Sequence, residues 1–162
     1  MANVLEKIVI DKKLEIAQRK IDLPLASFID GLTPSDRSFY DALAQPNASF
    51  VLECKKASPS KGLIRENFDL DEIIQAYSPY AACISVLTDE KYFQGNFDYL
   101  EYVRSRVTQP VINKDFFVKP YQIYLARYHN ADAVLLMLSV LDDDQYLELA
   151  NIADQYQLDV LT

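Results

Sequence analysis

The chain has 162 residues, 50% of them hydrophobic and 25% charged, and its 16 basic and 24 acidic side chains give a net charge of −8. This length and composition are typical of one globular domain with a hydrophobic core, and they exclude disordered, collagen-like and low-complexity chains. The acidic balance argues against nonspecific nucleic-acid binding, because the phosphate backbone favours clustered Lys and Arg. An anionic small molecule can still bind a local basic pocket, since net charge does not describe one cleft.

The sequence indicates neither a membrane span nor a secretory signal. Its longest core-like apolar run, residues 133–138, is far shorter than the ~18 residues that a membrane helix needs. The N-terminus alternates charged and apolar residues and lacks the apolar region of a signal peptide. Cys54 and Cys83 each lie in an apolar stretch, which favours two buried reduced thiols over a disulfide or a metal site. We therefore expect a cytoplasmic protein.

The first part of the chain is predicted to be helical. Residues 3–20 carry apolar side chains at helical spacing, and Asn3 followed by Glu6 resembles a capping box. Residues 22–45 contain several Pro and Gly residues and predict short helical turns and loops. We interpret residues 1–47 as an N-terminal helical extension.

From residue 48 onward, short apolar runs alternate with amphipathic segments. Strands alternating with helices predict an α/β fold with a parallel sheet that is buried on both faces. The expected strands are Phe50–Cys54, Cys83–Leu87, Val111–Asn113, Val134–Met137 and Asp159–Leu161, and the expected helices are Leu70–Tyr77, Phe97–Val107, Pro120–Tyr128 and Asp143–Tyr156.

Two architectures fit this order of elements. The length favours a doubly wound five-stranded sheet, because a (β/α)₈ barrel usually needs ~250 residues. The chain ends at Thr162, however, directly on the fifth strand and without a helix to cover it. This ending favours the alternative, the first part of a barrel, with residues 48–162 truncated at strand 5.

Charged residues stand where buried strands should be apolar. Glu53 and Lys55 share one face near the carboxyl end of the first strand, by the two-residue period of a strand. Lys114 ends the third strand, where active sites of parallel α/β folds collect their residues. The structural alternatives are an ion pair at the strand exit and a solvent-facing Lys114. The functional interpretation is a site in which the environment shifts the pKa values of these charged side chains, so that they bind an anion and transfer protons.

The remaining polar and aromatic signals are weaker. Loop 57–62 contains hydroxyls, a lysine and a glycine, but it lacks the spacing of a P-loop. Phe93 either forms the wall of a pocket for a flat substrate or packs under its own loop. The acidic run 142–144 precedes a predicted helix and indicates capping rather than metal binding. His129 is the only histidine, and a surface or helix-end position is expected for it.

Four blocks of the chain form a recognisable pattern. They are Leu-Glu-Cys-Lys-Lys-Ala-Ser-Pro-Ser-Lys-Gly at 52–62, Ser-Val-Leu-Thr-Asp-Glu-Lys-Tyr-Phe-Gln-Gly at 85–95, Lys-Asp-Phe at 114–116 and Ala-Asp-Ala-Val-Leu-Leu at 131–136. Together they resemble the indole-3-glycerol phosphate synthase family of tryptophan biosynthesis. The resemblance spans essentially all of the chain. It implies a (β/α)₈ barrel and a carbon–carbon lyase that uses no metal or organic cofactor. The implied reaction is ring closure of 1-(2-carboxyphenylamino)-1-deoxyribulose 5-phosphate, a phosphorylated anthranilate derivative, with loss of carbon dioxide and water.

The resemblance also implies roles for single residues. Lys114 matches the general acid that protonates the ketone, Lys55 matches a residue that contacts anionic substrate groups and assists dehydration, and Glu53 matches its carboxylate partner. The substrate-binding positions that match are Ser58, Pro59, Phe93 and Leu135.

The family pattern continues beyond this chain. In the family a general-base glutamate follows the position of Thr162, three further strands complete the barrel, and some members are fused to a phosphoribosylanthranilate isomerase barrel. We therefore expect the chain alone to be inactive and its open strand edges to favour instability or self-association. The alternative interpretations are a non-catalytic half-barrel that needs a complementary chain, and a self-contained doubly wound binding module.

Overall fold

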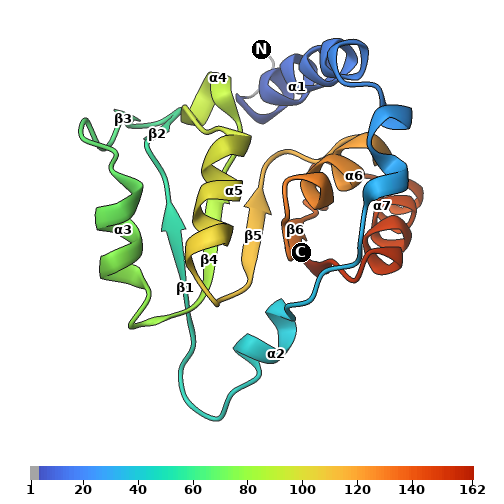
Figure 1. The fold of residues 1–162 in the computed structure, drawn as a ribbon. Helices are drawn as coiled ribbons and strands as arrows, with labels where there is room; N and C mark the ends of the chain where they lie inside the picture. Colours follow the sequence, from blue (N-terminus) through green and yellow to red (C-terminus); the bar gives the residue numbers. More distant parts are fainter. Residues whose placement is uncertain (1–3) are drawn as a thin grey trace.

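The computed structural model describes residues 4–162 as helices packed around one five-stranded parallel sheet (Figure 1). Asn3, half of the expected capping box, lies outside the described residues. Of the helices described, none has the combination of length and hydropathy that a bilayer crossing requires.

The strands of the sheet follow one another in chain order. The order is β1 (Phe50–Cys54), β4 (Ala81–Leu87), β5 (Val111–Lys114), β6 (Ala133–Leu135) and β7 (Asp159–Leu161), and every pair is parallel. A doubly wound sheet reverses its strand order at a switch point, whereas consecutive strands of a (β/α)₈ barrel do not. The expected barrel-type α/β fold is therefore confirmed, and the doubly wound alternative is wrong.

Four helices connect the strands and bury the main core against the sheet. They are α3 (Leu70–Tyr77), α5 (Phe97–Arg106), α6 (Pro120–Tyr128) and α7 (Asp143–Gln155). The acidic run caps α7 as predicted, since the side chain of Asp142 accepts a hydrogen bond from the Gln145 amide. His129 ends α6, also as predicted. Fully buried side chains of the core include Ile84, Val86, Leu100, Val111, Ile123, Leu125 and Val134.

Two loops contain structure that the sequence pattern did not predict. The loop after β1 forms a small antiparallel hairpin of β2 (Ala57–Ser58) and β3 (Gly62–Leu63), and the loop after β4 contains the short helix α4 (Glu90–Phe93). The predicted strand at Val134–Met137 is wrong at its end. The Met137 carbonyl accepts hydrogen bonds from the amides of Val140 and Leu141, so a turn replaces the strand there.

The N-terminal helices lie at opposite ends of the strands. Helix α1 (Val4–Asp22) lies at the end toward which β1 and β5 point, at the top of Figure 1, and α2 (Phe39–Leu43) lies at the other end. The connection contains the short 3₁₀ helices η1 (Leu25–Ser27) and η2 (Ile29–Gly31), as the Pro and Gly pattern predicted. Phe39 of α2 packs against Cys83, Ile112 and Ala133 on the inner face of the sheet.

Candidate active site

Glu53 joins two lysines at the carboxyl end of the sheet. Its Oε1 accepts a 2.6 Å hydrogen bond from Nζ of Lys55, and its Oε2 accepts a 2.6 Å hydrogen bond from Nζ of Lys114. The exposed side-chain fractions are 22% for Glu53, 36% for Lys55 and 41% for Lys114, so solvent and ligand can reach all three groups. The cluster carries a net positive charge.

The two-residue period of the strands explains why these side chains meet. Glu53 and Lys55 are two residues apart at the end of β1, and Ile112 and Lys114 are two residues apart on β5, so each pair points to one face. Ile112 belongs to the inner cluster, which identifies that face as the inner one. The parallel strands β1 and β5, with β4 between them, thus place all three charged groups at one end of the inner face.

The lysines hold Glu53 in its charged form. Partial burial alone would raise the pKa of this carboxyl, but the hydrogen bonds and charges of Lys114 and Lys55 outweigh burial and lower the pKa below its ordinary value. Glu53 is therefore a carboxylate at neutral pH, and the two ammonium groups stay beside it.

The charged cluster borders an apolar pocket of about 430 Å³. Five of the seven residues proposed from sequence line it, and its aromatic wall is formed by Phe93 and Phe116, whose ring centroids are 6.1 Å apart. Ser58 and Pro59 lie instead on the β2–β3 hairpin and are not among the lining residues. The full lining is Glu53, Lys55, Leu87, Phe93, Ile112, Lys114, Asp115, Phe116, Leu135, Met137 and Leu161.

Some lining residues were not assigned to the site from sequence. Asp115 and Phe116 directly follow Lys114, and their position after a strand was the available signal. Leu87 and Ile112 share the inner face with the charged residues, which strand alternation alone could have indicated. Met137 lies beyond the end of β6, where a strand pattern gives no facing direction.

The short loop after β4 fixes the position of Phe93. The side chain of Asp89 caps α4 by accepting a 2.7 Å hydrogen bond from the Tyr92 amide. Gln94 then adopts a left-handed conformation with φ of 51°, and Gly95 returns the chain so close to β4 that an added Cβ would lie 2.3 Å from the Leu87 carbonyl oxygen. Only glycine fits at this approach.

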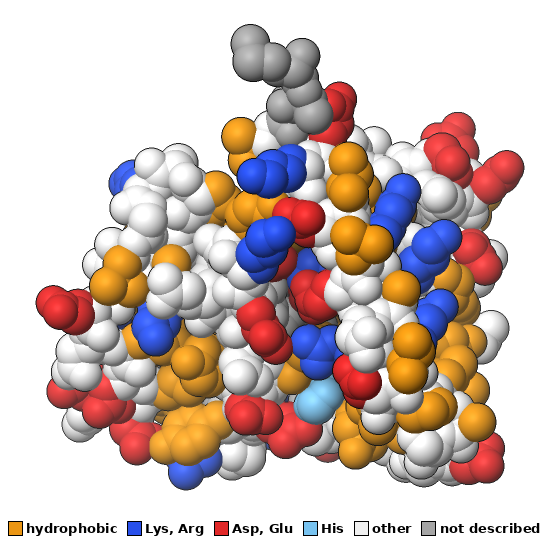
Figure 2. All heavy atoms as spheres, turned by 90° about the horizontal axis from the view of Figure 1, so that it is seen from above, with side chains coloured by type: hydrophobic (Ala, Val, Ile, Leu, Met, Phe, Trp, Pro, Cys, Tyr) orange, Lys and Arg blue, Asp and Glu red, His pale blue; other side chains and the backbone are white. Residues whose placement is uncertain are grey.

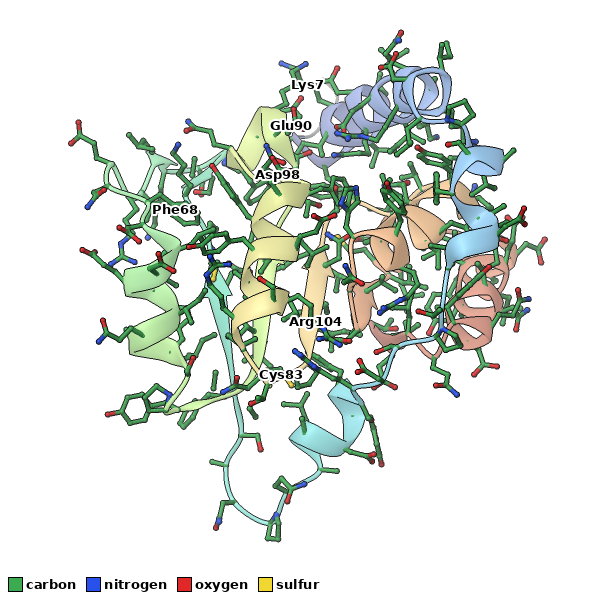
Figure 3. The ribbon with its side chains drawn as sticks, viewed as in Figure 1. Lys7, Phe68, Cys83, Glu90, Asp98 and Arg104 are labelled. Carbon is green, nitrogen blue, oxygen red and sulfur yellow. The ribbon has the colours of Figure 1, made fainter. Side chains whose placement is uncertain are left out.

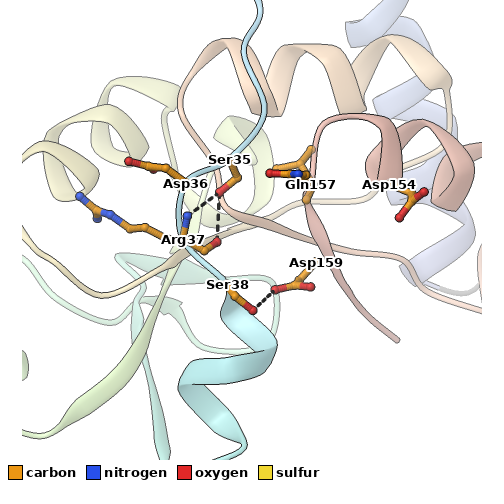
Figure 4. A pocket seen from close by; sticks show the side chains of 8 residues that line it. Ser35, Asp36, Arg37, Ser38, Asp154, Gln157 and Asp159 are labelled. Carbon is orange, nitrogen blue, oxygen red and sulfur yellow. Dashed lines mark hydrogen bonds between the residues drawn. The ribbon is translucent and has the colours of Figure 1, made fainter.

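A second hollow, of about 460 Å³, lies at the opposite end of the sheet (Figure 4). It is lined by Ser35, Arg37 and Ser38 and by residues of the α7–β7 turn. Its polar groups bind one another: Ser38 donates to Asp159, and Ser35 both donates to the Arg37 carbonyl and accepts from the Arg37 amide. The Ser38–Asp159 contact ties the N-terminal segment to β7, and neither Lys55 nor Lys114 lines this hollow.

The chemistry of the first pocket is specific. Two ammonium groups complement an anionic ligand, an ammonium group can donate a proton, and a carboxylate can accept one. The apolar wall suits a flat aromatic ring, and partial exclusion of water strengthens the charge interactions beside it. The arrangement fits acid–base chemistry on an anionic aromatic compound.

Comparisons with known proteins identify the family of the chain. The chain is 63% identical over 162 residues to the "Tryptophan biosynthesis protein TrpCF" of Vibrio cholerae and 57% identical over 162 residues to the protein of the same name from Salmonella typhi. All of this chain is covered in both alignments, but only 34% and 36% of the relatives, so the chain spans about a third of their length. The family model described as indole-3-glycerol phosphate synthase matches residues 5–162. The chain belongs to the indole-3-glycerol phosphate synthase family.

Proposed function

We propose that this chain supplies the Glu53, Lys55 and Lys114 cluster of an indole-3-glycerol phosphate synthase. The single observation that carries the proposal is that Glu53 bridges the two lysines at the edge of an apolar, aromatic-lined pocket. The substrate, 1-(2-carboxyphenylamino)-1-deoxyribulose 5-phosphate, combines the features that this pocket complements: an aromatic ring, a carboxylate and a phosphate.

Lys114 acts as the general acid of ring closure. The ring carbon that bears the carboxylate attacks the ketone carbon, and the new carbon–carbon bond forms as the ketone oxygen takes a proton from the Lys114 ammonium. Carbon dioxide then leaves, and its bonding electrons restore the aromatic ring. A positioned acid of this kind typically contributes ~10²- to 10⁴-fold to the rate.

Lys55 binds an anionic group of the substrate, and both Lys55 and Glu53 take part in the dehydration. Lys55 donates the proton with which the hydroxyl leaves as water. Glu53 is the carboxylate partner that accepts the proton lost from the adjacent carbon, next to the ring nitrogen, as the double bond forms. Phe93 and Leu135 enclose the anthranilate ring, which is supported by their place in the pocket lining. Ser58 and Pro59 bind at the border of the substrate from the β2–β3 hairpin.

We propose that residues 1–47 form an N-terminal extension and residues 48–162 the first part of a barrel, which further strands complete. Strands β1 and β7 are hydrogen-bonded to a described strand on one side only, and Phe50 and Leu161 on them are 56% and 41% exposed. The 162 aligned residues are 34% of the Vibrio cholerae relative, which therefore has about 480 residues. This length suits two (β/α)₈ barrels of roughly 250 residues each. A C-terminal isomerase barrel is the second one we propose.

The same open edges support one alternative, a non-catalytic half-barrel that acts only with a complementary chain. Activity assays of the 162-residue chain, alone and mixed with the remainder of the protein, test this alternative, because it predicts activity only in the mixture.

We also propose a cytoplasmic location, because Cys54 and Cys83 are free and buried and their burial raises the pKa of both thiols to about 12. Unpaired buried cysteines are typical of proteins in reducing compartments.

The test uses the intact product of the gene that encodes this chain. Purified protein should convert the substrate to fluorescent indole-3-glycerol phosphate, and Lys114→Met should lower kcat at least 100-fold. Lys13→Met is the matched control, because Lys13 is an exposed lysine of α1 and does not line the pocket. Absence of product with the wild-type protein, or equal kcat for the two variants, would refute the proposal.

A further inference from the structure

Lys12 of α1 is a buried lysine outside the proposed catalytic cluster. Its side chain has an exposed fraction of 0%, and it lies between Ile8 and Ile16 on the buried face of the helix. Its Nζ lies 2.9 Å from Oδ2 of Asp89 and 2.9 Å from Oδ1 of Asp115. A buried ammonium group is tolerated only where it is well paired, so these contacts fix its position.

The pairing keeps Lys12 charged. Burial alone would lower the pKa of its ammonium group, but the carboxylates of Asp115, Asp89 and Glu15 outweigh burial and raise it. Glu15 Oε2 lies 2.7 Å from Nζ, so three carboxylates surround the ammonium group at ion-pair distance.

The two aspartates belong to the two loops that form the pocket. Asp89 caps α4, which carries Phe93. Asp115 follows Lys114, and its Oδ1 accepts a 2.7 Å hydrogen bond from the Phe116 amide. Lys12 therefore joins the loop of the aromatic wall to the segment that carries the proposed general acid.

Further hydrogen bonds connect the same two segments. Thr88, next to Asp89, donates from Oγ1 to Oδ2 of Asp115 over 2.8 Å and from its amide to the Lys114 carbonyl over 3.2 Å. Asn113 donates from Nδ2 to Oγ1 of Thr88 over 2.8 Å. All of these side chains are buried. A displacement of Asp115 would thus be transmitted directly to the backbone of Lys114.

The outer contacts between α1 and α4 are of a different kind. Nζ of Lys91 lies 2.7 Å from Oδ2 of Asp11, and Nη2 of Arg19 lies 3.1 Å from Oε1 of Glu90, which lies at the edge of α4 nearest α1 (Figure 3). Figure 2 shows acidic and basic side chains side by side over this exposed face. The Tyr92 hydroxyl also donates to Oδ2 of Asp11. Exposed ion pairs contribute little, so among the ion pairs that α1 makes with these two segments the buried one of Lys12 should contribute most.

We propose that Lys12 is a positioning residue for the ring-closure reaction. It acts through Asp115 and Asp89 to fix the positions of Lys114 and Phe93 relative to each other in the pocket. This inference rests on the proposed function. It assigns the N-terminal helix a part in the chemistry, although no atom of Lys12 lines the pocket.

The test compares Lys12→Met with Lys13→Met in the intact gene product, measuring kcat, KM and the unfolding midpoint. Lys12→Met should lower kcat at least tenfold and change KM less than threefold, because misplacement of a catalytic group affects the reacting geometry. Asp115→Asn should lower kcat similarly, and the double variant Lys12→Met/Asp115→Asn should be no worse than Asp115→Asn, since the two residues act in series.

The triple variant Lys12→Met/Asp89→Asn/Asp115→Asn guards against loss of folding. It removes the three charges at similar side-chain volume, so neither Lys12 nor either aspartate is left as an unpaired buried charge, and it should fold with the same loss of kcat. A kcat within twofold of Lys13→Met in a folded variant, an effect on KM alone, or unfolding of every Lys12 variant would overturn the proposal. If the wild-type protein itself forms no product, the proposed function has failed instead.

Discussion

Lys114 donates a 2.6 Å hydrogen bond to Glu53 across the inner face of the sheet, although the two residues are 61 positions apart and their strands are not neighbours. β4 lies between β1 and β5, and its inner-face residue Leu87 lines the same pocket. The hydrogen bond between Glu53 and Lys114 therefore spans the apolar inner-face side chain of Leu87. This contact depends on the tertiary fold, and it brings the proposed acid and its carboxylate partner together.

Lys55→Met should weaken substrate binding more than it slows the chemical step. The side chain contributes a charge-assisted hydrogen bond, typically worth ~1.5–3 kcal/mol, to an anionic group of the substrate. We expect KM to rise at least about tenfold. Steady-state kinetics of the intact protein, with Lys13→Met as control, check this, and an unchanged KM would contradict the role of Lys55.

Phe93→Ala should raise KM about tenfold by removing an aromatic wall of the pocket. The matched control is Tyr80→Ala, because Tyr80 is 73% exposed and does not line the pocket. Fluorescence titration with a product analogue gives the affinity directly. Equal affinities of the two variants would show that Phe93 packs only against its own loop.

Glu53 should stabilise the protein at neutral pH and cease to do so in acid. Its pKa is lowered in the folded state, so its contribution is present above the unfolded pKa of ~4.3 and is lost as the pH falls through the lower folded value. The measurement is the free energy of unfolding in urea for wild type and Glu53→Gln between pH 7 and pH 3. The difference should be largest at pH 7 and shrink below about pH 4; a difference that grows in acid would contradict the sign.

Asp132→Ala should be strongly destabilising. Asp132 is fully buried; its carboxylate accepts hydrogen bonds from Ser35 Oγ at 2.8 Å and the Val111 amide at 2.9 Å, and lies 2.8 Å from Nε of Arg104. Breaking a buried ion pair in this way typically costs ~3–5 kcal/mol.

The control for Asp132 is Asp30→Ala, an exposed aspartate of η2, which should cost about 0.5 kcal/mol or less. Urea unfolding of both variants provides the comparison. Similar losses would mean that the Asp132 contacts do not stabilise the fold.

The sequence was most informative where its periodicity was simple. Strand β1 and helices α3 and α6 have the predicted bounds, because their apolar patterns and capping residues agree. Strand β6 ends early, because the chain turns after Met137, whose carbonyl accepts from the Val140 and Leu141 amides. Residues 136–138 are nevertheless apolar enough to continue a strand pattern. Apolarity alone does not distinguish a strand from a buried turn.

The site was predictable in part for a related reason. Charged residues on otherwise apolar strands identified Glu53, Lys55 and Lys114. The same signal was present at Lys12, which lies four residues from both Ile8 and Ile16 on the apolar face of α1, but its partners Asp89 and Asp115 come from distant loops. No local pattern gives such a pairing.

The central claim is that this pocket carries out decarboxylative ring closure, and substrate labelled with ¹³C in its carboxylate tests it most directly. The intact protein should release labelled carbon dioxide and form indole-3-glycerol phosphate in equal amounts, and Lys114→Met should lower the rates of both together, at least 100-fold. Ring product that retains the label, or labelled carbon dioxide released without ring product, would contradict the account.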